Sequence, residues 1–281
     1  MNELADFAGR WFVVKVGGEL AGDPDRLAAS VGAAVRAFRD SGIRVAVVHG
    51  GGPQATELSK RLGLQPTMVG GRRVTDAATL EVMKMTLAGQ VSVDVAAALR
   101  LARVPALCTT GVSAGLVDAV RRPPMVVSGA GSAPVDLGRV GDIVAVDTAA
   151  LERLADAGFV PVLGSLGGDA QGAVFNINAD TVATRVAARL QAAKLFLVSN
   201  VPGVLRDKDD PGTRMPRLSP AEARAQIASG VIAGGMIPKV EESLAMLDAG
   251  IEAIHIVGID PPSSVLDEAR EPGSRGTAFV R

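Results

Sequence analysis

Residues 45–53, Val-Ala-Val-Val-His-Gly-Gly-Gly-Pro, constrain the fold of this chain more than any other stretch. Four consecutive apolar residues are typical of a buried strand, and Pro53 suits the first position of a following helix. Because glycine has no Cβ atom, Gly50, Gly51 and Gly52 would let backbone N–H groups approach a ligand closely. A helix start adds unpaired donors and positive dipole, so we interpret this loop as an anion-binding turn. A tight turn without a ligand is the alternative.

Short apolar runs recur along the chain, and helical periodicity follows them. Several runs carry adjacent apolar residues rather than strict alternation, which favours parallel strands covered on both faces. This alternation of strands and helices predicts an α/β fold: a doubly wound, mostly parallel open sheet (an αβα sandwich) in two lobes. Residues 112–145 break the rhythm with turns and short alternating stretches, 115–120 and 134–140, so we expect an antiparallel hairpin insertion there. The predicted strands are 12–16, 45–48, 104–108, 159–163, 195–198 and 253–257.

Helix boundaries are also legible in the sequence. Asp23-Pro24 predicts a cap and a first turn, and further helices are expected to begin at residue 180 or 181 and near residue 239. The polar segment 207–220 carries three prolines. It is interpreted either as a mobile lid or as a plain surface loop.

Composition excludes several classes of protein. Hydrophobic residues make up 48% of the 281-residue chain, which argues against disorder. A net charge of −1 and the absence of tyrosine disfavour base-stacking recognition of nucleic acid. Cys108 is the single cysteine, so a disulfide framework and a multi-cysteine metal site are excluded. No apolar run reaches the roughly 18 residues that span a bilayer and no signal peptide is evident, so we expect no membrane partner and a cytoplasmic location.

Three charged residues occupy positions that point to chemistry. Lys15 lies inside an apolar strand, where an ammonium group is costly unless it reaches a partner or a ligand. Asp180 ends the segment Asn176-Ile-Asn-Ala-Asp180, and Lys239 follows a second glycine pair, Gly234-Gly235. Two lysines, a carboxylate and two glycine loops suit transfer of a phosphoryl group between two anionic partners. The plainer interpretations are a snorkelling lysine, a helix N-cap and an exposed lysine after a turn.

Competing motifs are less specific. Residues 50–55 match the G-x-G-x-x-A dinucleotide fingerprint, and Asp76 lies at roughly the right distance. However, Asp76 does not end a clear second strand, and the chain has no P-loop motif. Neither histidine has a second ligand or a nucleophile at motif spacing, so we expect His255 to be structural and His49 to orient the glycine loop.

Six short motifs follow one another in order: Lys15-Val-Gly-Gly18, His49-Gly-Gly-Gly-Pro53, Gly71-Arg-Arg-Val-Thr-Asp76, Val140-Gly-Asp142, Asn176-Ile-Asn-Ala-Asp180 and Gly234-Gly-Met-Ile-Pro-Lys239. In order and spacing they resemble the motifs of the amino acid kinase family, and the resemblance covers almost the whole chain. It implies ATP-dependent phosphorylation of the side-chain carboxylate of N-acetyl-L-glutamate to an acyl phosphate, in arginine biosynthesis. The implied cofactors are ATP and Mg²⁺, with the metal held mainly by the phosphates and no metal site made by the protein.

The resemblance also implies roles for individual residues. Lys15 and Lys239 would neutralise the moving phosphoryl group, and Asp180 would orient them. Residues 1–175 would form the acceptor-substrate lobe and residues 176–281 the nucleotide-binding lobe. The implied binding residues are Gly17 and Gly18 for phosphate; Gly50, Gly51, Gly52, Arg73 (α-carboxylate) and Asn176 (acetamido group) for the acceptor; and Ser199, Asn200, Gly203 and Gly235 for the nucleotide.

The chain also departs from the family pattern. Ser92-Val93 stands where Asn-Lys is usual, residues 111–115 replace the usual Gly-Lys-Asp-Gly segment, and Asn200 stands where Asp is common. Asn200 and the Lys15-Val-Gly-Gly18 motif are similar to relatives that phosphorylate aminoadipate or glutamate on a carrier protein, which is one alternative activity. A non-catalytic amino-acid-binding regulator on the same fold is another. The first strand begins near residue 12, without the long N-terminal helix of hexameric members, so we expect a homodimer.

Overall fold

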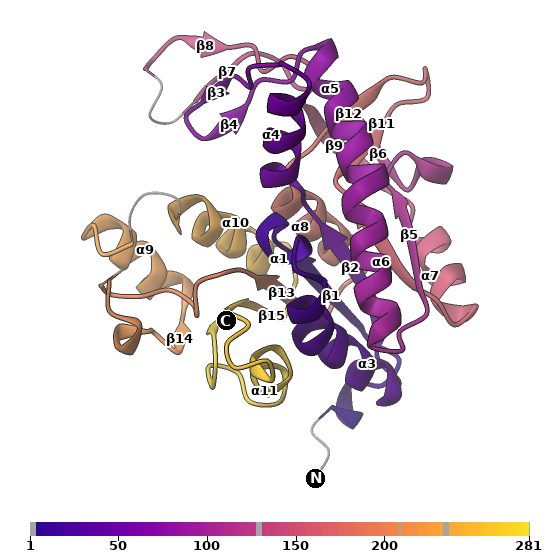
Figure 1. Cartoon of the computed structure of the whole chain (residues 1–281). Helices are drawn as coiled ribbons and strands as arrows, with labels where there is room; N and C mark the ends of the chain where they lie inside the picture. Colours follow the sequence, from indigo (N-terminus) through magenta and orange to yellow (C-terminus); the bar gives the residue numbers. More distant parts are fainter. Residues whose placement is uncertain (1–3, 128–130, 208, 233–235, 281) are drawn as a thin grey trace.

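An eight-stranded sheet runs through the computed structural model, in the order β14-β16-β15-β13-β1-β2-β10-β5 (Figure 1). The structure describes residues 4–127, 131–207, 209–232 and 236–280. Within the sheet, β16 runs antiparallel to β15 and parallel to β14, and all the other pairings are parallel. The strands are β1 Trp11–Val16, β2 Arg44–His49, β5 Ala106–Thr110, β10 Val160–Gly164, β13 Lys194–Val198, β14 Arg217–Leu218, β15 Ala253–Val257 and β16 Thr277–Val280.

Helices cover both faces of this sheet, because alternate side chains of each central strand enter two separate cores. Val13 of β1 packs with the core that contains α7, α8 and α10, whereas Phe12 packs with α2, α3, α6 and α11. The expected doubly wound αβα arrangement is therefore confirmed. The helices are α1 Gly18–Ala21, α2 Pro24–Leu27, α3 Ala33–Asp40, α4 Gly52–Arg61, α5 Ala77–Lys84, α6 Val91–Leu101, α7 Thr148–Asp156, α8 Ala179–Arg189, α9 Pro220–Ala228, α10 Met236–Asp248 and α11 Ser264–Arg270.

Capping residues explain several helix starts. The Asp23 side chain accepts the N–H of Arg26 at 3.1 Å, so the expected cap before α2 is present. Ser219 and Glu222 form a reciprocal capping box at the start of α9. The segment 207–220 is therefore partly built into the fold, since it also contains β14 and ends at this cap.

A second sheet, in the order β12-β11-β6-β9, lies beside the first. Its β6 and β9 are antiparallel, and so is the small pair β7–β8, which confirms the hairpin insertion within residues 112–145. The expected strand at 134–140 is shorter than predicted, because Asp136 accepts the N–H of Gly138 in a turn. These strands are β6 Val117–Arg121, β7 Met125–Val126, β8 Pro134–Val135, β9 Gly141–Val146, β11 Leu166–Gly168 and β12 Val174–Asn176, and a further hairpin is formed by β3 Met68–Val69 and β4 Arg72–Arg73.

The helical run Ala77–Leu101 joins α5, a π-helical segment Met85–Gln90 and α6. Among the described residues it is the one helix long and apolar enough to cross a membrane by length and composition, although half of its apolar window is buried inside the protein. It contains no uninterrupted apolar run of that length, because polar residues are scattered through it. Leu87, Val91 and Leu99 pack in the protein core, as expected for a core helix.

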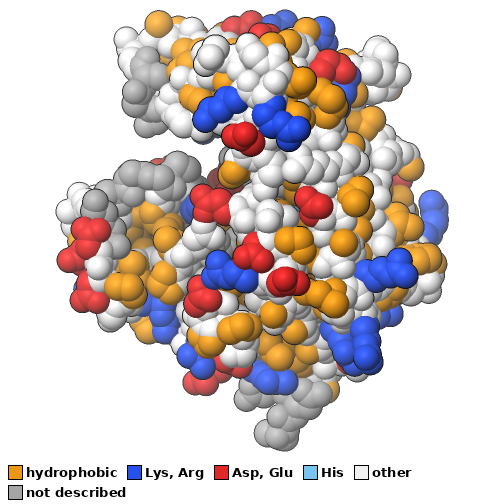
Figure 2. Space-filling view, in the orientation of Figure 1, with side chains coloured by type: hydrophobic (Ala, Val, Ile, Leu, Met, Phe, Trp, Pro, Cys, Tyr) orange, Lys and Arg blue, Asp and Glu red, His pale blue; other side chains and the backbone are white. Residues whose placement is uncertain are grey.

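Figure 1 shows how these parts frame the site. The hairpins β3–β4 and β7–β8 lie above the carboxyl ends of β1 and β2, and α9 and α10 lie on the other side of the same opening. In the space-filling view the molecule is hollowed between these two parts (Figure 2). Ligands of open α/β sheets bind at this edge of the strands.

Candidate active site

Asp180 lies between the two lysines that the sequence singled out. Its Oδ1 is 2.8 Å from Nζ of Lys15, and its Oδ2 is 3.4 Å from Nζ of Lys239. Lys15 comes from the middle of the sheet, Asp180 from the first turn of α8 and Lys239 from the first turn of α10. The structure therefore brings together three charged side chains that are far apart in the sequence.

Asp180 is not the cap of its helix. Asn178 is the N-cap of α8, and its Oδ1 accepts the N–H of Asp180 at 2.8 Å. The interpretation of Asp180 as an N-cap is wrong, because the helix begins two residues earlier. Burial alone would raise the pKa of Asp180, but the ammonium groups of Lys15 and Lys239 lower that pKa below its usual value. The carboxylate is therefore ionised and holds both cations in place.

Two glycine turns approach each other beside Lys15. A Cβ on Gly18 would lie 2.8 Å from Cδ of Pro53, and one on Gly51 would lie 3.0 Å from Cδ2 of Leu87, so only glycine fits without a shift. Gly18 opens α1 and Gly51 is the N-cap of α4, where backbone N–H groups have no intrahelical acceptor. The described part of the chain offers neither of these N–H groups a backbone acceptor, so both are available to an anion.

The neighbouring glycines differ in what they offer. The N–H of Gly50 donates to the carbonyl of Val16 at 3.2 Å and is not free for a ligand. A Cβ on Gly52 would meet nothing within 4 Å, so the protein itself does not require glycine there. Gly17 is the N-cap of α1 and has extended backbone geometry.

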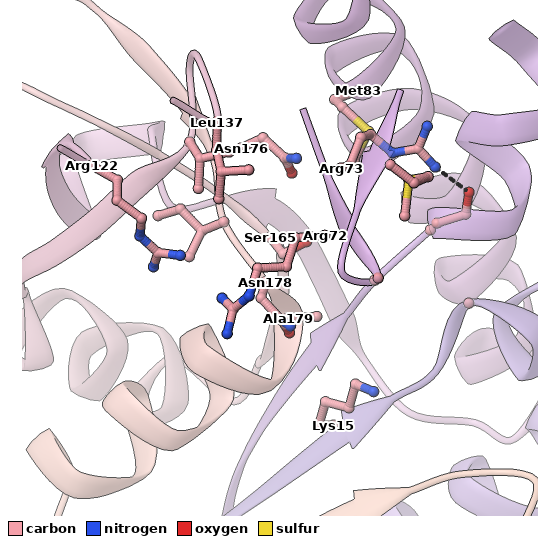
Figure 3. A pocket seen from close by; sticks show the side chains of 18 residues that line it. Lys15, Arg72, Arg73, Met83, Arg122, Leu137, Ser165, Asn176, Asn178 and Ala179 are labelled. Atoms are coloured by element: carbon pink, nitrogen blue, oxygen red, sulfur yellow. Dashed lines mark hydrogen bonds between the residues drawn. The ribbon is translucent and has the colours of Figure 1, made fainter. Parts of the chain in front are cut away.

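A cavity of about 300 Å³ opens in front of these turns (Figure 3). In the close-up, Arg73 and Met83 lie on one side, Arg122, Leu137 and Asn176 on the other, and Lys15 at the base. Every charged residue in its lining is basic, so the cavity favours an acidic ligand. The lining residues are Lys15, Gly18, Gly50, Gly51, Gly52, Met68, Gly71, Arg72, Arg73, Met83, Arg122, Leu137, Val140, Ser165, Asn176, Ile177, Asn178 and Ala179.

Arg73 is held with one side of its guanidinium free. Its Nη2 donates to the carbonyl of Gly52 at 3.2 Å and to Oγ1 of Thr56 at 2.7 Å. Its Nη1 is buried and has no hydrogen-bond partner among the described residues. Burial also lowers the pKa of Arg73 from its usual value, so an anion at Nη1 would relieve an unfavourable state.

Sequence reasoning missed two cations of this cavity. Arg72 lies within the Gly71–Asp76 motif, but the resemblance implies no role for it, and no motif marks Arg122. Arg122 forms an ion pair with Asp142 at 2.7 Å, and Asp142 belongs to the Val140-Gly-Asp142 motif. The adjacent Arg121-Arg122 pair after a short strand was the available signal, but its place depends on pairing between β6 and β9.

A second cavity, of about 450 Å³, lies in the C-terminal part of the chain. It is mostly apolar, and Gly203 is the one predicted nucleotide residue in its lining; Ser199 and Asn200 are not part of it. Gly235 lies outside the described residues, immediately before Met236, which does line the cavity. The lining residues are Val201, Gly203, Leu205, Arg206, Asp207, Gly230, Val231, Ile232 and Met236.

Asp76 and His255 lie outside the two cavities and have structural partners. Asp76 is the N-cap of α5 and accepts the N–H of Thr79 at 2.8 Å, after a small hairpin rather than a strand of the main sheet. The dinucleotide interpretation is therefore wrong, because its acidic residue is missing from the required position. His255 is fully buried and bonded to Glu268 at 2.8 Å, which confirms a structural role. Among the residues described, no group of three or more His, Cys, Asp or Glu side chains could hold a metal ion.

The basic cavity with Lys15 in its lining, the ion pairs of Asp180 with Lys15 and Lys239, and the glycine turns beside them suit a small-molecule kinase. The amino acid kinase family model matches residues 10–258, and the chain belongs to this family. It is 53% identical over 268 residues to the acetylglutamate kinase of Sorangium cellulosum (strain So ce56), covering 95% of this chain and 94% of that protein. It is 49% identical to the acetylglutamate kinase of Anaeromyxobacter dehalogenans (strain 2CP-C), covering 95% of this chain and 98% of that one.

Solved structures agree in fold. The N-acetylglutamate synthase from Neisseria gonorrhoeae, complexed with coenzyme A and N-acetyl-glutamate, matches with a TM-score of 0.82 and 27% identity. The match covers 99% of this chain, which spans 61% of the length of that synthase. The carbamate kinase from Giardia lamblia bound to AMP-PNP matches with a TM-score of 0.67 and 19% identity, over 98% of this chain and 99% of that one, and supports the fold alone.

Proposed function

We propose that this chain transfers the γ-phosphoryl group of ATP to the side-chain carboxylate of N-acetyl-L-glutamate, the acetylglutamate kinase reaction of arginine biosynthesis. The observation that carries the proposal is that Asp180 bridges Lys239 and Lys15, and that Lys15 lies at the base of a basic cavity. The high identity to acetylglutamate kinases over nearly the full chain supports the choice of acceptor.

The chemistry follows from the charges. The acceptor carboxylate is already ionised at neutral pH, so its oxygen attacks the γ-phosphorus without a general base, while the bond to the ADP oxygen breaks. Negative charge accumulates on the moving group, where the ammonium groups of Lys15 and Lys239 and the N–H groups of Gly18 and Gly51 stabilise it. Asp180 keeps the two lysines oriented before the substrates arrive.

The acceptor is placed by its two ends. The free Nη1 of Arg73 receives the α-carboxylate, and Asn176, whose Nδ2 donates to Oγ1 of Thr75 at 3.1 Å, lies near the acetamido group. The loop of Gly50, Gly51 and Gly52 lies along the reacting carboxylate, with Gly17 and Gly18 on the phosphoryl side. Apart from Asn176, at the start of the second lobe, these residues belong to the proposed acceptor lobe of residues 1–175.

The nucleotide belongs to the lobe of residues 176–281. The mostly apolar second cavity, with Gly203 in its wall, suits the adenosine part of ATP. Ser199, Asn200 and Gly235 would serve the phosphate and ribose side rather than the apolar wall. Mg²⁺ would be held by the ATP phosphates. A cytoplasmic location is part of this proposal.

A homodimer is supported by one uncovered helix face. Val93 and Leu101 on α6 are 64% and 65% exposed, and Met85, in the π-helical segment before α6, is 49% exposed. Beside α6, strand β5 forms an open edge of the main sheet. Sedimentation should show a dimer that Val93→Glu dissociates and the exposed control Val120→Glu does not. A monomeric parent protein would contradict the proposal.

A substrate panel tests the proposed function. Purified protein with ATP and Mg²⁺ should release ADP with free N-acetyl-L-glutamate, and much less with glutamate or aspartate. Turnover only with a carrier-linked acceptor would establish the alternative aminoadipate- or glutamate-carrier kinase. Binding of the amino acid in calorimetry without any turnover would establish the regulator instead.

A further inference from the structure

His49 lies directly behind the glycine loop and outside the substrate cavity. It ends β2, is fully buried and contacts polar groups at both ring nitrogens. Nδ1 is 3.1 Å from the carbonyl oxygen of Gly50, and Nε2 is 3.0 Å from Oγ of Ser92. Oγ of Ser92 is in turn 2.8 Å from the carbonyl oxygen of Leu87.

The three hydrogen bonds in this series of contacts require more protons than His49 and Ser92 supply. Both of its ends are carbonyl oxygens, which only accept, so its three contacts need three protons. A neutral imidazole and a serine hydroxyl supply two. The third would require an imidazolium, and burial opposes that charge by lowering the pKa of His49. The ring is therefore neutral, and one contact lacks a proton.

Of the two neutral tautomers of His49, the one with the ring proton on Nδ1 has the lower free energy. With the proton on Nε2, the Nδ1 lone pair would face the Gly50 oxygen at 3.1 Å in a buried site. With the proton on Nδ1, Gly50 is satisfied and the Ser92 hydroxyl turns toward Nε2. Leu87 then loses only a serine donor, and a carbonyl has a second lone pair for other donors.

Packing prevents the ring from moving away. A Cβ on Gly164, at the end of β10, would lie 3.3 Å from both Cε1 and Nε2 of His49 and 2.8 Å from the Leu87 oxygen. Only a glycine leaves room for the ring there. The imidazole is thus held by Gly164 of β10, by Ser92 of α6 and by the Gly50 carbonyl.

The hydrogen bond from His49 to the Gly50 carbonyl also orients the next backbone N–H, that of Gly51. The Gly50 carbonyl and the Gly51 N–H belong to one planar trans peptide and point in opposite directions. A donor that fixes the carbonyl also fixes the N–H, which has no backbone acceptor among the described residues. The opposite end of Gly50 is held too, since its own N–H donates to Val16.

We propose that His49, as its Nδ1–H tautomer with Ser92 at Nε2, is a positioning residue that aims the Gly51 N–H at the transferring phosphoryl group. This inference rests on the proposed kinase function. His49 touches neither substrate. It acts through the Gly50–Gly51 peptide, so its removal lowers kcat more than it raises KM for the acceptor.

Two amide variants separate this role from plain packing. The amide nitrogen of His49→Asn reaches the place of Nδ1 and can still donate to Gly50, whereas that of His49→Gln reaches the place of Nε2. We expect His49→Gln to lower kcat about 10- to 100-fold, less than the roughly 100- to 1000-fold for losing an oxyanion donor outright, because the Gly51 N–H is misdirected rather than removed. His49→Asn should stay within about fivefold of the parent. KM for N-acetyl-L-glutamate should change less than about threefold in both. Equal losses of kcat in the two variants would overturn the proposal.

The tautomer of His49 can also be measured on the unmutated, ligand-free protein. This test of the proposal depends neither on the folding of the variants nor on enzyme activity. The chain has two histidines, so ¹H–¹⁵N two-bond correlation spectra contain two ring systems, and the His49→Asn spectrum assigns them. We expect His49 to be neutral with its proton on Nδ1 at pH 7. A proton on Nε2, or an imidazolium, would overturn the inference, whatever the enzyme assay shows. Failure of the parent protein to phosphorylate any panel substrate would instead reject the kinase function while leaving the tautomer result intact.

Discussion

Replacing Asp180 by asparagine removes the negative charge between Lys15 and Lys239 while keeping the shape of the side chain. The carboxylate oxygens lie 2.8 Å and 3.4 Å from the two ammonium nitrogens, and among the described residues no other acid forms an ion pair with either lysine. After the change, two cations face each other across a neutral amide. The prediction is a loss of both stability and turnover.

The size of the effect can be worked from the distances. With an effective dielectric constant of about 20, Coulomb's law gives gross attractions of about 6 and about 5 kcal/mol for the two pairs. Desolvation of the buried groups offsets much of this attraction. Removing one partner of a buried pair typically costs about 3–5 kcal/mol, which is the expected drop in the free energy of unfolding. The Lys15 side chain is 10% exposed and that of Lys239 is 25% exposed, so Lys15 should contribute the larger share.

Urea unfolding and steady-state ADP release measure the two losses separately. Asp180→Asn should lower kcat by about 100-fold or more, because misplaced lysines no longer meet the developing charge. In double-mutant cycles, the coupling of Asp180→Asn with Lys15→Met should exceed its coupling with Lys239→Met. An unfolding free energy within about 1 kcal/mol of the parent value, together with an unchanged kcat, would refute the reasoning.

Three further predictions concern other parts of the protein. Arg73→Lys should raise the acceptor KM by roughly 10- to 100-fold in ADP-release assays, because a point charge replaces a charge-assisted guanidinium contact worth about 1.5–3 kcal/mol, and an unchanged KM would remove Arg73 from the site. Gly51→Ala should lower kcat at least about tenfold, since its Cβ would press on the Leu87 and Val91 side chains. Gly52→Ala is the control, and an equal kcat for the two variants would contradict the role of the loop. Stability in urea should fall as pH drops below about 6.5, and a flat profile from pH 7 to 4 would contradict the account.

The sign of that pH effect follows from two buried groups. Burial lowers the pKa of His255, so below about pH 6.5 the unfolded chain takes up a proton that the folded chain refuses. Burial alone would raise the pKa of Glu268, but the His255 hydrogen bond and backbone N–H groups outweigh it and lower that pKa. Its contribution is present above about pH 4.5 and is lost as pH falls through the lowered value. Both groups therefore destabilise the folded chain on acidification.

The central strands could be predicted because each carries its own local signal. Runs such as 253–257 are apolar enough to be buried on both faces, and β15 has these same bounds. The edge strand β14 and its neighbour β16 were not predicted, since β14 has two residues and both depend on long-range pairing. Strands β11 and β12 were not predicted for the same reason, since each has only three residues.

Site residues could be predicted where a residue's chemistry is unusual for the helix or strand that carries it. Lys15 in an apolar strand is such a residue, and its ammonium group does reach Asp180. Arg122 gave no such signal, because a basic residue at a strand end is ordinary in sequence and enters the cavity only through the packing of the second sheet. The cap of α8 also depended on geometry, since asparagine at 178 and aspartate at 180 are both good caps.

Trapping of the reaction product tests the central claim most directly. With ATP, Mg²⁺ and N-acetyl-L-glutamate, an acyl phosphate on the side-chain carboxylate should react with hydroxylamine to give the side-chain hydroxamate, identified by mass spectrometry. We predict this hydroxamate with the parent protein, and at least a hundredfold less of it with Lys239→Ala, because one of the two cations on the moving group is lost. No hydroxamate from the parent protein, or equal amounts from both proteins, would contradict phosphoryl transfer at the Lys15–Asp180–Lys239 cluster.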